Sequence, residues 1–357
     1  MRTGAAASTQ HEQIRVALFG FGRVGRGMAT LLTRRAGVEV VAVISRSLAG
    51  QPARDHVPGL PAPLVITFDV ERALAGARPH VVLHATAPRL SDVSGQLMMA
   101  LQAGCHVIST CEELAYPWVV HRDAAEALDG AARRSDVSLL GTGVNPGFVF
   151  DALVLEALSS RWSPTAITVS RVTDASSFGP AVRGRLGLGL QPAAFDAMVA
   201  AGDVAGHVGF RESMDLVGAA LGVEVDTFEE SLRPVVAERS ESGVAAGLTA
   251  GFTQLAVGTC RGGLRFEFRL SLHLWPRTLG LEIVDSVGIE DGGAIYEMQM
   301  RPASPPVETA AAQMVNAIPH VLAAEPGLRT RLDMRGPTPW ISFPTALGWR
   351  RSAPGTR

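Results

Sequence analysis

The sequence contains no lysine: of its 357 residues, 32 are basic, and all 32 are arginine. This absence excludes enzymes that bind their substrate or cofactor as a lysine Schiff base, including pyridoxal phosphate enzymes and lysine aldolases. It also excludes the Walker A phosphate loop, whose lysine contacts the phosphates, and dehydrogenases that use lysine as an acid or base. The simplest origin is codon bias in a GC-rich genome, but the exclusions hold whatever the origin.

The sequence also has few cysteines, a small net charge and no long apolar run. Cys105, Cys111 and Cys260 are too few and too scattered for a disulfide framework or a zinc site, so we expect no metal and a reducing cytoplasm. A net charge of −2 gives no electrostatic reason to expect nucleic acid or an anionic membrane as partner. Apolar runs such as Val38–Ile44 are too short to cross a bilayer. Residues 1–13 lack the apolar centre of a signal peptide, and we expect them to form a disordered tail.

The first part of the chain alternates short apolar runs, which predict buried strands, with apolar residues at helical spacing. The predicted strands are Ile14–Phe19, Val38–Ile44, Val81–His84, His106–Ser109 and Ser138–Leu140, and the predicted helices are Val24–Arg35, Val70–Ala77, Gln96–Ala103 and Ala124–Ser135. Strands that alternate with helices indicate a parallel, doubly wound sheet. We therefore predict an α/β protein whose N-terminal Rossmann domain spans residues 14–146.

Longer and often alternating strand patterns follow from Thr165 onward. They are Ile167–Val172, Val223–Arg233, Ala245–Cys260, Leu264–Leu274 and Leu281–Ile289, with a Gly/Pro-rich interruption at Phe178–Pro192. This pattern predicts a C-terminal α+β domain, residues 147–306, built on a mixed or antiparallel sheet. Pro302–Pro306 is a plausible linker, and a helix at Val307–Ala324 would bring residues 307–357 back onto the first domain.

A glycine-rich segment follows the first predicted strand directly and opens a helix. In Gly20-Phe21-Gly22-Arg23-Val24-Gly25, the first glycine permits a tight turn, the second lets a pyrophosphate approach the backbone, and the third lets helix and strand pack closely. The pyrophosphate would then lie at the helix N-terminus, where free N–H groups favour negative charge. We therefore predict that Gly20, Gly22, Arg23, Val24 and Gly25 bind a dinucleotide, the alternative being a glycine-rich turn without a ligand.

The second predicted strand ends in Ser45-Arg46-Ser47, where NAD-binding domains usually have an acid that binds the ribose. An arginine between two hydroxyl groups suits the 2′-phosphate of NADP, so we predict a preference for NADP, with NAD as a possible second cofactor. The alternative is that Arg46 lies on a solvated loop without a partner. After the third strand, the small residues Ala85, Thr86 and Ala87 would let the nicotinamide half approach. His84 before them is at least as well explained as a hydrogen-bonded structural histidine.

Two adjacent acids, Glu112 and Glu113, follow the fourth strand at the ligand edge of the sheet. Thr110 and Glu113 have capping-box spacing, which explains Glu113 as part of a helix N-terminus. Glu112 has no such explanation, and a carboxylate beside a nicotinamide could hold or deprotonate water, ammonia or an amine. We therefore predict Glu112 as the catalytic residue, the alternative being a solvent-facing acid in a first helical turn.

The next strand leads into Gly141-Thr142-Gly143-Val144-Asn145-Pro146-Gly147-Phe148 at the predicted domain junction. Its glycines indicate close backbone packing or special dihedral angles. Asn145 places an amide at the junction, where ligand pockets are common. Turn structure explains the glycines equally well, but it explains Asn145 less well.

These segments together resemble the 2,4-diaminopentanoate dehydrogenases and, equally, the related native amine dehydrogenases, which are structurally near dihydrodipicolinate reductase. The motifs are Gly20–Gly25, Ser109–Pro117, Gly141–Asp151 and the pair Ile318-Pro319-His320 and Glu325-Pro326-Gly327-Leu328. The resemblance covers the chain from Ile14 to about Trp340, and its most specific motif is Gly-Thr-Gly-Val-Asn-Pro-Gly-Phe. The adjacent histidines and the lysine loop of dihydrodipicolinate reductase itself are absent.

The resemblance implies reversible, NAD(P)-dependent deamination, with a Glu-Glu-Leu acid that matches Glu112. It also implies a substrate pocket and a homodimer formed through the sheet of the second domain. The implied polar pocket residues are Asn145, Arg171 and His273, and we predict that Phe148, Val149, Thr173 and Phe178 also shape the pocket. Thr173 stands where the diamine enzymes are expected to have asparagine, which weakens the case for a diamine substrate. The residues alone favour the alternatives, in which Arg171 lies on an outward strand face and His273 in the core.

We therefore predict an NAD(P)H-dependent amine dehydrogenase that converts a ketone or aldehyde and ammonia to a primary amine. Two alternatives stay open. One is 2,4-diaminopentanoate dehydrogenase, or another imine or amino acid oxidoreductase on the same scaffold. The other is a non-catalytic regulator that binds NADP, which the combination of Glu112 and Asn145 disfavours.

Overall fold

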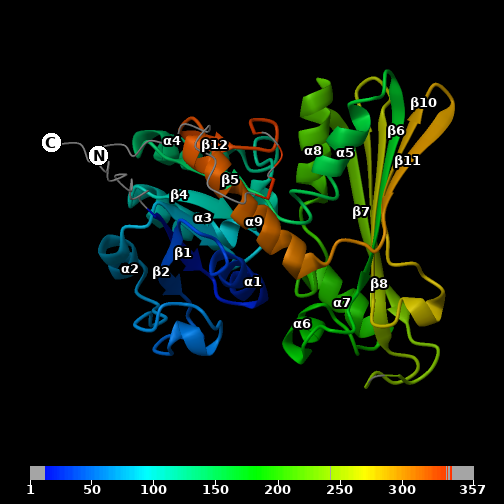
Figure 1. Ribbon diagram of the computed structural model, residues 1–357. Helices are drawn as coiled ribbons and strands as arrows, with labels where there is room; N and C mark the ends of the chain where they lie inside the picture. Colours follow the sequence, from blue (N-terminus) through cyan, green and yellow to red (C-terminus); the bar gives the residue numbers. More distant parts are fainter. Residues whose placement is uncertain (1–12, 242, 335, 337, 340–357) are drawn as a thin grey trace, which may run out of the picture.

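The computed structural model describes residues 13–334 except 242, together with 336, 338 and 339. Of the tail predicted at residues 1–13, only Gln13 is among the described residues, and most of the chain after 334 also lies outside them. Two domains lie side by side (Figure 1), one coloured blue to cyan and the other green to yellow. The orange helix near the end of the chain lies on the first domain.

The first domain is built on a six-stranded parallel sheet. In spatial order its strands are β2 (Val38–Ile44), β1 (Ile14–Phe19), β3 (Val81–His84), β4 (His106–Ser109), β5 (Ser138–Gly141) and β12 (Gly327–Arg329). The strand order reverses at β1 and β3, and ligands of such sheets lie beyond the carboxyl ends of the strands at this point. The predicted Rossmann-type fold is therefore confirmed.

Helices cover both faces of this sheet. On one face lie α1 (Arg23–Leu32) and α9 (Pro306–Ala323), and on the other lie α2 (Val70–Ala77), α3 (Leu90–Gln102) and α4 (Arg122–Arg134). Met314, Ile318 and Val321 of α9 are fully buried against α1 and the sheet. Since each such side chain stabilises the fold by about 1.5–3 kcal/mol, α9 is firmly part of the first domain.

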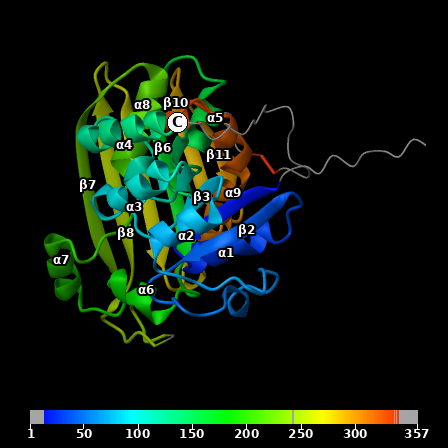
Figure 2. The ribbon, with the colours of Figure 1, turned by 90° about the vertical axis from the view of Figure 1, so that its left-hand side faces the viewer.

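The second domain has a mixed six-stranded sheet. Its spatial order is β11 (Ala294–Met300), β10 (Asp285–Asp291), β6 (Pro164–Asp174), β9 (Arg265–His273), β8 (Thr249–Cys260) and β7 (Val225–Val236). Only β6 and β9 run parallel, so the predicted mixed sheet is confirmed. On the side facing the first domain lie α5 (Ala152–Leu158), α6 (Pro180–Arg185), α7 (Pro192–Ala201) and α8 (Phe210–Leu221). Figure 2 shows this sheet behind α3 and α4 of the first domain.

Several elements differ from the sequence predictions. Helix α3 begins at Leu90, six residues before the predicted Gln96, and the Glu113 carboxylate binds this start of the helix. The Gly/Pro-rich stretch 178–192 contains α6, and strands β6 and β8 have other limits than predicted. The elements α5, α7, α8, β11 and β12 and the short 3-10 helices at Ala53–Asp55 and Arg277–Leu279 were not predicted. The helix expected to begin near Glu112 is the single 3-10 turn Glu112–Leu114.

Candidate functional site

The glycine-rich segment forms a tight turn where β1 meets β3. Gly20 has φ +98°, and a Cβ atom there would lie 2.2 Å from the carbonyl oxygen of Ala85. A Cβ atom on Gly25 would lie 2.1 Å from the carbonyl oxygen of Gly20, so this glycine lets α1 pack closely on the turn. By contrast, a Cβ atom on Gly22 would meet nothing within 4 Å, so its backbone is open to a ligand.

The N-terminus of α1 fits the pyrophosphate of a dinucleotide. Among the described residues, no side chain caps this end and its first turn contains no acid. The free N–H groups and the helix dipole therefore favour an anion. Arg23 at the first helical position adds a positive charge, and its guanidinium lies 5.4 Å from the ring centroid of Phe178 in the second domain. Val24 is partly buried between the two cores.

Ser45, Arg46 and Ser47 follow β2 at the same edge of the sheet. The backbone N–H of Ser45 donates to the carbonyl of Thr67 at 2.9 Å, which fixes the start of this loop. Arg46 is exposed, and its guanidinium lies 5.1 Å from the ring centroid of Phe68, which is 49% exposed. This contact orients the guanidinium while leaving it accessible to a phosphate.

The segment after β3 has a structural histidine at its start. His84 is buried and contacts Ser109 Oγ, Gln96 Oε1 and Thr86 Oγ1, each at 2.9 Å. Burial lowers the pKa of His84 to about 4, although the hydrogen bond with Gln96 acts in the opposite direction. The ring is therefore neutral near pH 7, and it orders the Ala85–Ala87 backbone beside the glycine turn.

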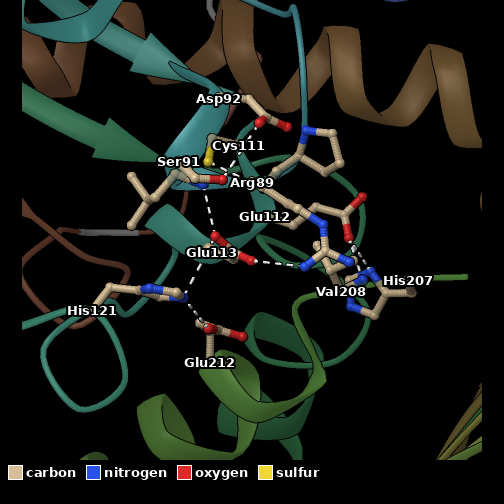
Figure 3. A network of polar contacts seen from close by, with 12 residues as sticks. Arg89, Ser91, Asp92, Cys111, Glu112, Glu113, His121, His207, Val208 and Glu212 are labelled. Carbon is tan, nitrogen blue, oxygen red and sulfur yellow. Dashed lines mark hydrogen bonds and ion pairs between the residues drawn. The ribbon is translucent and has the colours of Figure 1, made fainter. Parts of the chain in front are cut away.

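Glu112 lies at the domain junction, in the 3-10 helix that follows β4. Its side chain is 25% exposed, and its Oε2 atom lies 2.5 Å from Nδ1 of His207. The same oxygen accepts a hydrogen bond from the backbone N–H of Val208 at 2.9 Å. Figure 3 shows the carboxylate of Glu112 facing both residues, which come from the loop before α8 of the second domain. The predicted catalytic acid therefore contacts the second domain directly.

Asn145 lies beside this pair at the entrance to the second domain. Its Nδ2 atom is 3.2 Å from Nδ1 of His207, so His207 connects the two polar residues predicted for the site. The following turn is held by Asp151, which accepts hydrogen bonds from the backbone N–H groups of Gly147 and Ala152 at 2.7 and 2.5 Å. Gly147 has φ +117°, a conformation that few other residues adopt.

Glu113 has a different role from the one that its spacing predicted. Its carboxylate accepts a hydrogen bond from the backbone N–H of Leu90 at 2.7 Å, and its other oxygen lies 3.5 Å from Arg89 Nη1. Glu113 therefore binds the N-terminus of α3, and the predicted capping box with Thr110 is wrong. A local motif cannot reveal this contact, because the helix that receives the acid lies 23 residues earlier in the chain.

Next to Glu113, His121 lies between acids of the two domains. His121 Nε2 lies 3.5 Å from Glu113 Oε2 and 3.5 Å from Glu212 Oε1 of α8 (Figure 3). Glu212 is 2% exposed. Burial, together with the nearby carboxylates of Glu113, Asp215 and Glu112, raises the pKa of Glu212 to about 8, against a smaller lowering effect of a backbone hydrogen bond.

Glu212→Gln should remove a pH dependence of stability. The folded state binds the Glu212 proton more tightly than the unfolded state, whose pKa is near 4.5. The wild type should therefore lose stability relative to the variant as pH rises from about 4.5 to 8, by up to about 1.4 kcal/mol per pH unit. Urea denaturation of both proteins at pH 5, 6.5 and 8 measures this difference. A difference that is the same at all three pH values would contradict it.

Arg171 lies in a buried ion pair and not on an outward strand face. It is 2% exposed, its Nη1 atom lies 3.7 Å from Asp285 Oδ1, and its Nη2 atom donates to the carbonyl of Ser304. Asp285 in turn accepts a hydrogen bond from the backbone N–H of Ser304 at 2.7 Å. Burial lowers the pKa of Arg171, and Asp285 acts against that shift. Arg171 also donates to Thr173 Oγ1 at 3.3 Å.

A pocket of about 270 Å³ brings together three of the predicted residues. Arg23, Thr173 and Phe178 line it, opposite the linker Pro302–Pro306. The other predicted pocket residues do not line it: Val149 is fully buried in the core of the second domain, Phe148 packs against that core, and His273 is 4% exposed. Burial lowers the pKa of His273. Glu112 and Asn145 also lie outside its lining.

The described residues contain no group of three or more His, Cys, Asp or Glu side chains that could hold a metal ion. Cys105, Cys111 and Cys260 are all buried and unpaired. Within the described part of the chain, no helix is both long and apolar enough to cross a membrane.

The roles of His207, Gln254 and Asp151 were not predicted from the sequence. The signal closest to His207 is the pair of glycines in Gly206-His207-Val208-Gly209. A Cβ atom on Gly206 would lie 2.1 Å from Gln254 Oε1, and one on Gly209 would lie 2.6 Å from Pro146 Cγ. Both glycines therefore let this loop pack against distant residues, but the sequence alone does not show which.

Comparison with known proteins gives two matches along the sequence. Residues 148–345 match a family model described as the 2,4-diaminopentanoate dehydrogenase C-terminal domain. The chain is also 32% identical, over 334 residues, to the 2,4-diaminopentanoate dehydrogenase of Acetoanaerobium sticklandii. That match covers 91% of this chain and 94% of the relative.

Solved structures share the fold. An amine dehydrogenase from Mycobacterium smegmatis matches with a TM-score of 0.83 at 24% identity, covering 94% of this chain and all of that chain. A scyllo-inositol dehydrogenase from Lactobacillus casei, solved with NAD(H) and scyllo-inositol, matches with a TM-score of 0.53 at 14% identity. The second match covers 86% of this chain and 89% of that chain.

Proposed function

The chain belongs to the 2,4-diaminopentanoate dehydrogenase family and is an oxidoreductase, and from this premise we propose that it is an NAD(P)H-dependent amine dehydrogenase. It would convert a ketone or aldehyde and ammonia reversibly to a primary amine. The observation that supports this proposal is the position of Glu112, at the ligand edge of the Rossmann sheet with one carboxylate oxygen bonded by the second domain.

Glu112 would act on protons at the reacting centre. Ammonia adds to the carbonyl carbon, and the resulting carbinolamine loses its hydroxyl group as water once that group is protonated. The free oxygen of Glu112 would take a proton from the incoming ammonium, give it to the leaving hydroxyl and then stabilise the cationic iminium. Bound NADPH would supply the hydride that reduces the iminium to the amine.

The other predicted residues would bind the cofactor or form the substrate pocket. Gly20, Gly22 and the N-terminus of α1 would bind the pyrophosphate, with Ala85–Ala87 beside the nicotinamide half. Asn145 would orient the substrate next to Glu112, and Thr173 and Phe178 would line its far side. The remaining residues predicted for the pocket, Phe148, Val149, Arg171 and His273, would support it from the core.

A substrate panel tests this function. NADPH oxidation should be measured with short ketones, aldehydes and keto acids, each with and without ammonium, and NADP reduction with the matching amines and 2,4-diaminopentanoate. Oxidation that depends on ammonium supports an amine dehydrogenase. Activity with 2,4-diaminopentanoate and with no other amine would instead indicate a 2,4-diaminopentanoate dehydrogenase, as the Acetoanaerobium sticklandii relative is named. Turnover without ammonium would indicate a different oxidoreductase, and cofactor binding without any turnover would indicate a regulator.

We also propose a preference for NADP, supported by the exposed, oriented guanidinium of Arg46. Arg46→Ala should raise the KM for NADPH by about tenfold or more, because a charge-assisted bond to the 2′-phosphate is lost. The KM for NADH should change little. Arg54→Ala, which removes another exposed arginine, is the matched control. Equal losses with both cofactors, or a clear wild-type preference for NAD, would reject this proposal.

We further propose a cytoplasmic homodimer that forms through the second sheet. Among the described residues, no α-helix covers the face of this sheet that is turned away from the first domain (Figure 1). Val257 is 41% exposed on β8 between the buried Ala256 and Gly258, so it lies on that face. Val257→Arg should convert the dimer to a monomer in sedimentation equilibrium without a change in the circular dichroism spectrum. A wild-type monomer, or a variant that stays dimeric, would contradict it.

A further inference from the structure

The two carboxylate oxygens of Glu112 have different surroundings. Oε2 lies 2.5 Å from His207 Nδ1 and accepts the backbone N–H of Val208 at 2.9 Å. Within the described part of the chain, Oε1 accepts no hydrogen bond. Two adjacent donors of the second domain therefore hold one oxygen, and the other is available to a ligand.

His207 is itself held firmly. Its backbone N–H donates to Gln254 Oε1 at 2.7 Å, and its carbonyl accepts from Gln254 Nε2 at 2.5 Å. Its ring stacks on Phe150 with centroids 5.9 Å apart and an interplanar angle of 20°. Phe210 packs edge-on, with its centroid 4.6 Å from that of His207. The imidazole is 1% exposed, so it cannot turn away without disrupting this packing.

The surroundings also favour one tautomer. Nε2 of His207 is buried and has no hydrogen-bond partner among the described residues, so a hydrogen there would have no acceptor. A hydrogen on Nδ1 instead donates to Glu112. Because Nδ1 then cannot accept a hydrogen bond from Asn145 Nδ2, the Asn145 amide would be turned so that Oδ1 faces the ring.

Three acidic side chains lie near the ring. Glu112 contacts it directly, and Asp151 and Glu230 are close enough to interact with it electrostatically. Glu230 bonds to the same Gln254 amide that holds the His207 backbone. Among the described residues, the acceptor that contacts the ring, Glu112 Oε2, lies on its Nδ1 side, and Nε2 has no acceptor.

We propose that His207 is a positioning residue for Glu112. Its Nδ1–H bond, together with Val208 N–H, fixes the carboxylate in one rotamer, with Oε2 bonded and Oε1 directed to the substrate. The role of Oε1 rests on the proposed amine dehydrogenase function. Because Glu112 belongs to the first domain and both donors to the second, the acid is aligned only when the two domains are in contact. Misplacement of a reacting group by about 1 Å can cost about 100-fold in rate.

Three substitutions of His207 test the role of Nδ1 through turnover. Asparagine places an amide N–H near the position of Nδ1, glutamine places it near Nε2, and leucine fills a similar volume without any donor. His207→Leu and His207→Gln should lower kcat for amination by about 100-fold, with an unchanged Kd for NADPH. His207→Asn should recover at least a tenth of the wild-type kcat. A near-normal kcat for folded His207→Leu, or no recovery in folded His207→Asn, would overturn the proposal.

Nitrogen NMR tests the same bond without any turnover. In wild-type protein labelled with ¹⁵N-histidine, Nδ1 of His207 should give the signal of a protonated ring nitrogen and Nε2 that of an unprotonated one. Glu112→Gln should move the Nδ1–H proton signal upfield, because an amide oxygen is a weaker acceptor. An unprotonated Nδ1 would overturn the proposal. Since this spectrum requires no substrate, it still tests His207 if the substrate panel shows no amination.

Discussion

Glu112→Gln should lower kcat for reductive amination by about 10²–10⁴-fold, the range that a general acid–base group contributes. Glutamine keeps the shape of the side chain, and its amide oxygen can still accept the Val208 N–H bond. It can neither take nor give the proton that the reaction moves. The Kd for NADPH should stay unchanged, because the Glu112 carboxylate contacts His207 and Val208 and not the glycine turn that would bind the cofactor.

Glu113→Gln is the matched control, since it changes the adjacent acid in the same 3-10 helix. Glu113 bonds to the N-terminus of α3, so its replacement should lower thermal stability through a weaker interaction with the helix dipole. Its kcat should stay within about tenfold of wild type, well short of the loss expected at Glu112. Near-normal amination by Glu112→Gln, or equal losses in the two variants, would remove Glu112 from the reaction.

Asp285→Asn should reduce the free energy of unfolding by about 3–5 kcal/mol, because it leaves the Arg171 guanidinium charged and without its buried counter-ion. Both side chains are at most 1% exposed. The asparagine oxygen can still accept the Ser304 N–H bond, so the change isolates the charge. Urea denaturation measures the loss.

Glu290→Gln supplies the comparison on the same strand, β10. Its carboxylate lies 3.9 Å from Arg265 Nη2, with the two side chains 40% and 68% exposed. An exposed pair of this kind should contribute less than about 1 kcal/mol. If both variants lost the same small amount of stability, the buried pair would not stabilise the second domain, and Arg171 would be free for a direct role in the pocket.

The sequence predicts the first sheet well because its strands are defined locally. Strands β1, β2, β3 and β4 have the predicted limits, since each is a short, mostly apolar run that the sequence pattern marks off from its neighbours. The start of α3 could not be predicted, because Ser91, Ser94 and Gly95 weaken its local helical signal. The acid that stabilises this start, Glu113, comes from another element.

The same distinction applies to the candidate site. Glu112 could be identified from its place after a strand and from the lack of a capping role. Its partner could not be identified, because Val208 and Glu112 are 96 positions apart and only the contact between the two domains joins them. Arg171 was assigned to the pocket by resemblance alone. Its burial depends on Asp285, which is a neighbour only through the pairing of β6 with β10.

The last two strands at one side of the first sheet, β5 and β12, are separated in the chain by the whole second domain. The second domain is thus an insertion, connected to the first domain by two polypeptide crossings. During synthesis, residues 14–141 can be completed only when α9 and β12 arrive, because α1 covers only part of the sheet face that α9 later completes. The first domain to begin folding is therefore the last to be completed. A ribosome that stalls within the second domain would leave that apolar face exposed to chaperones and proteases.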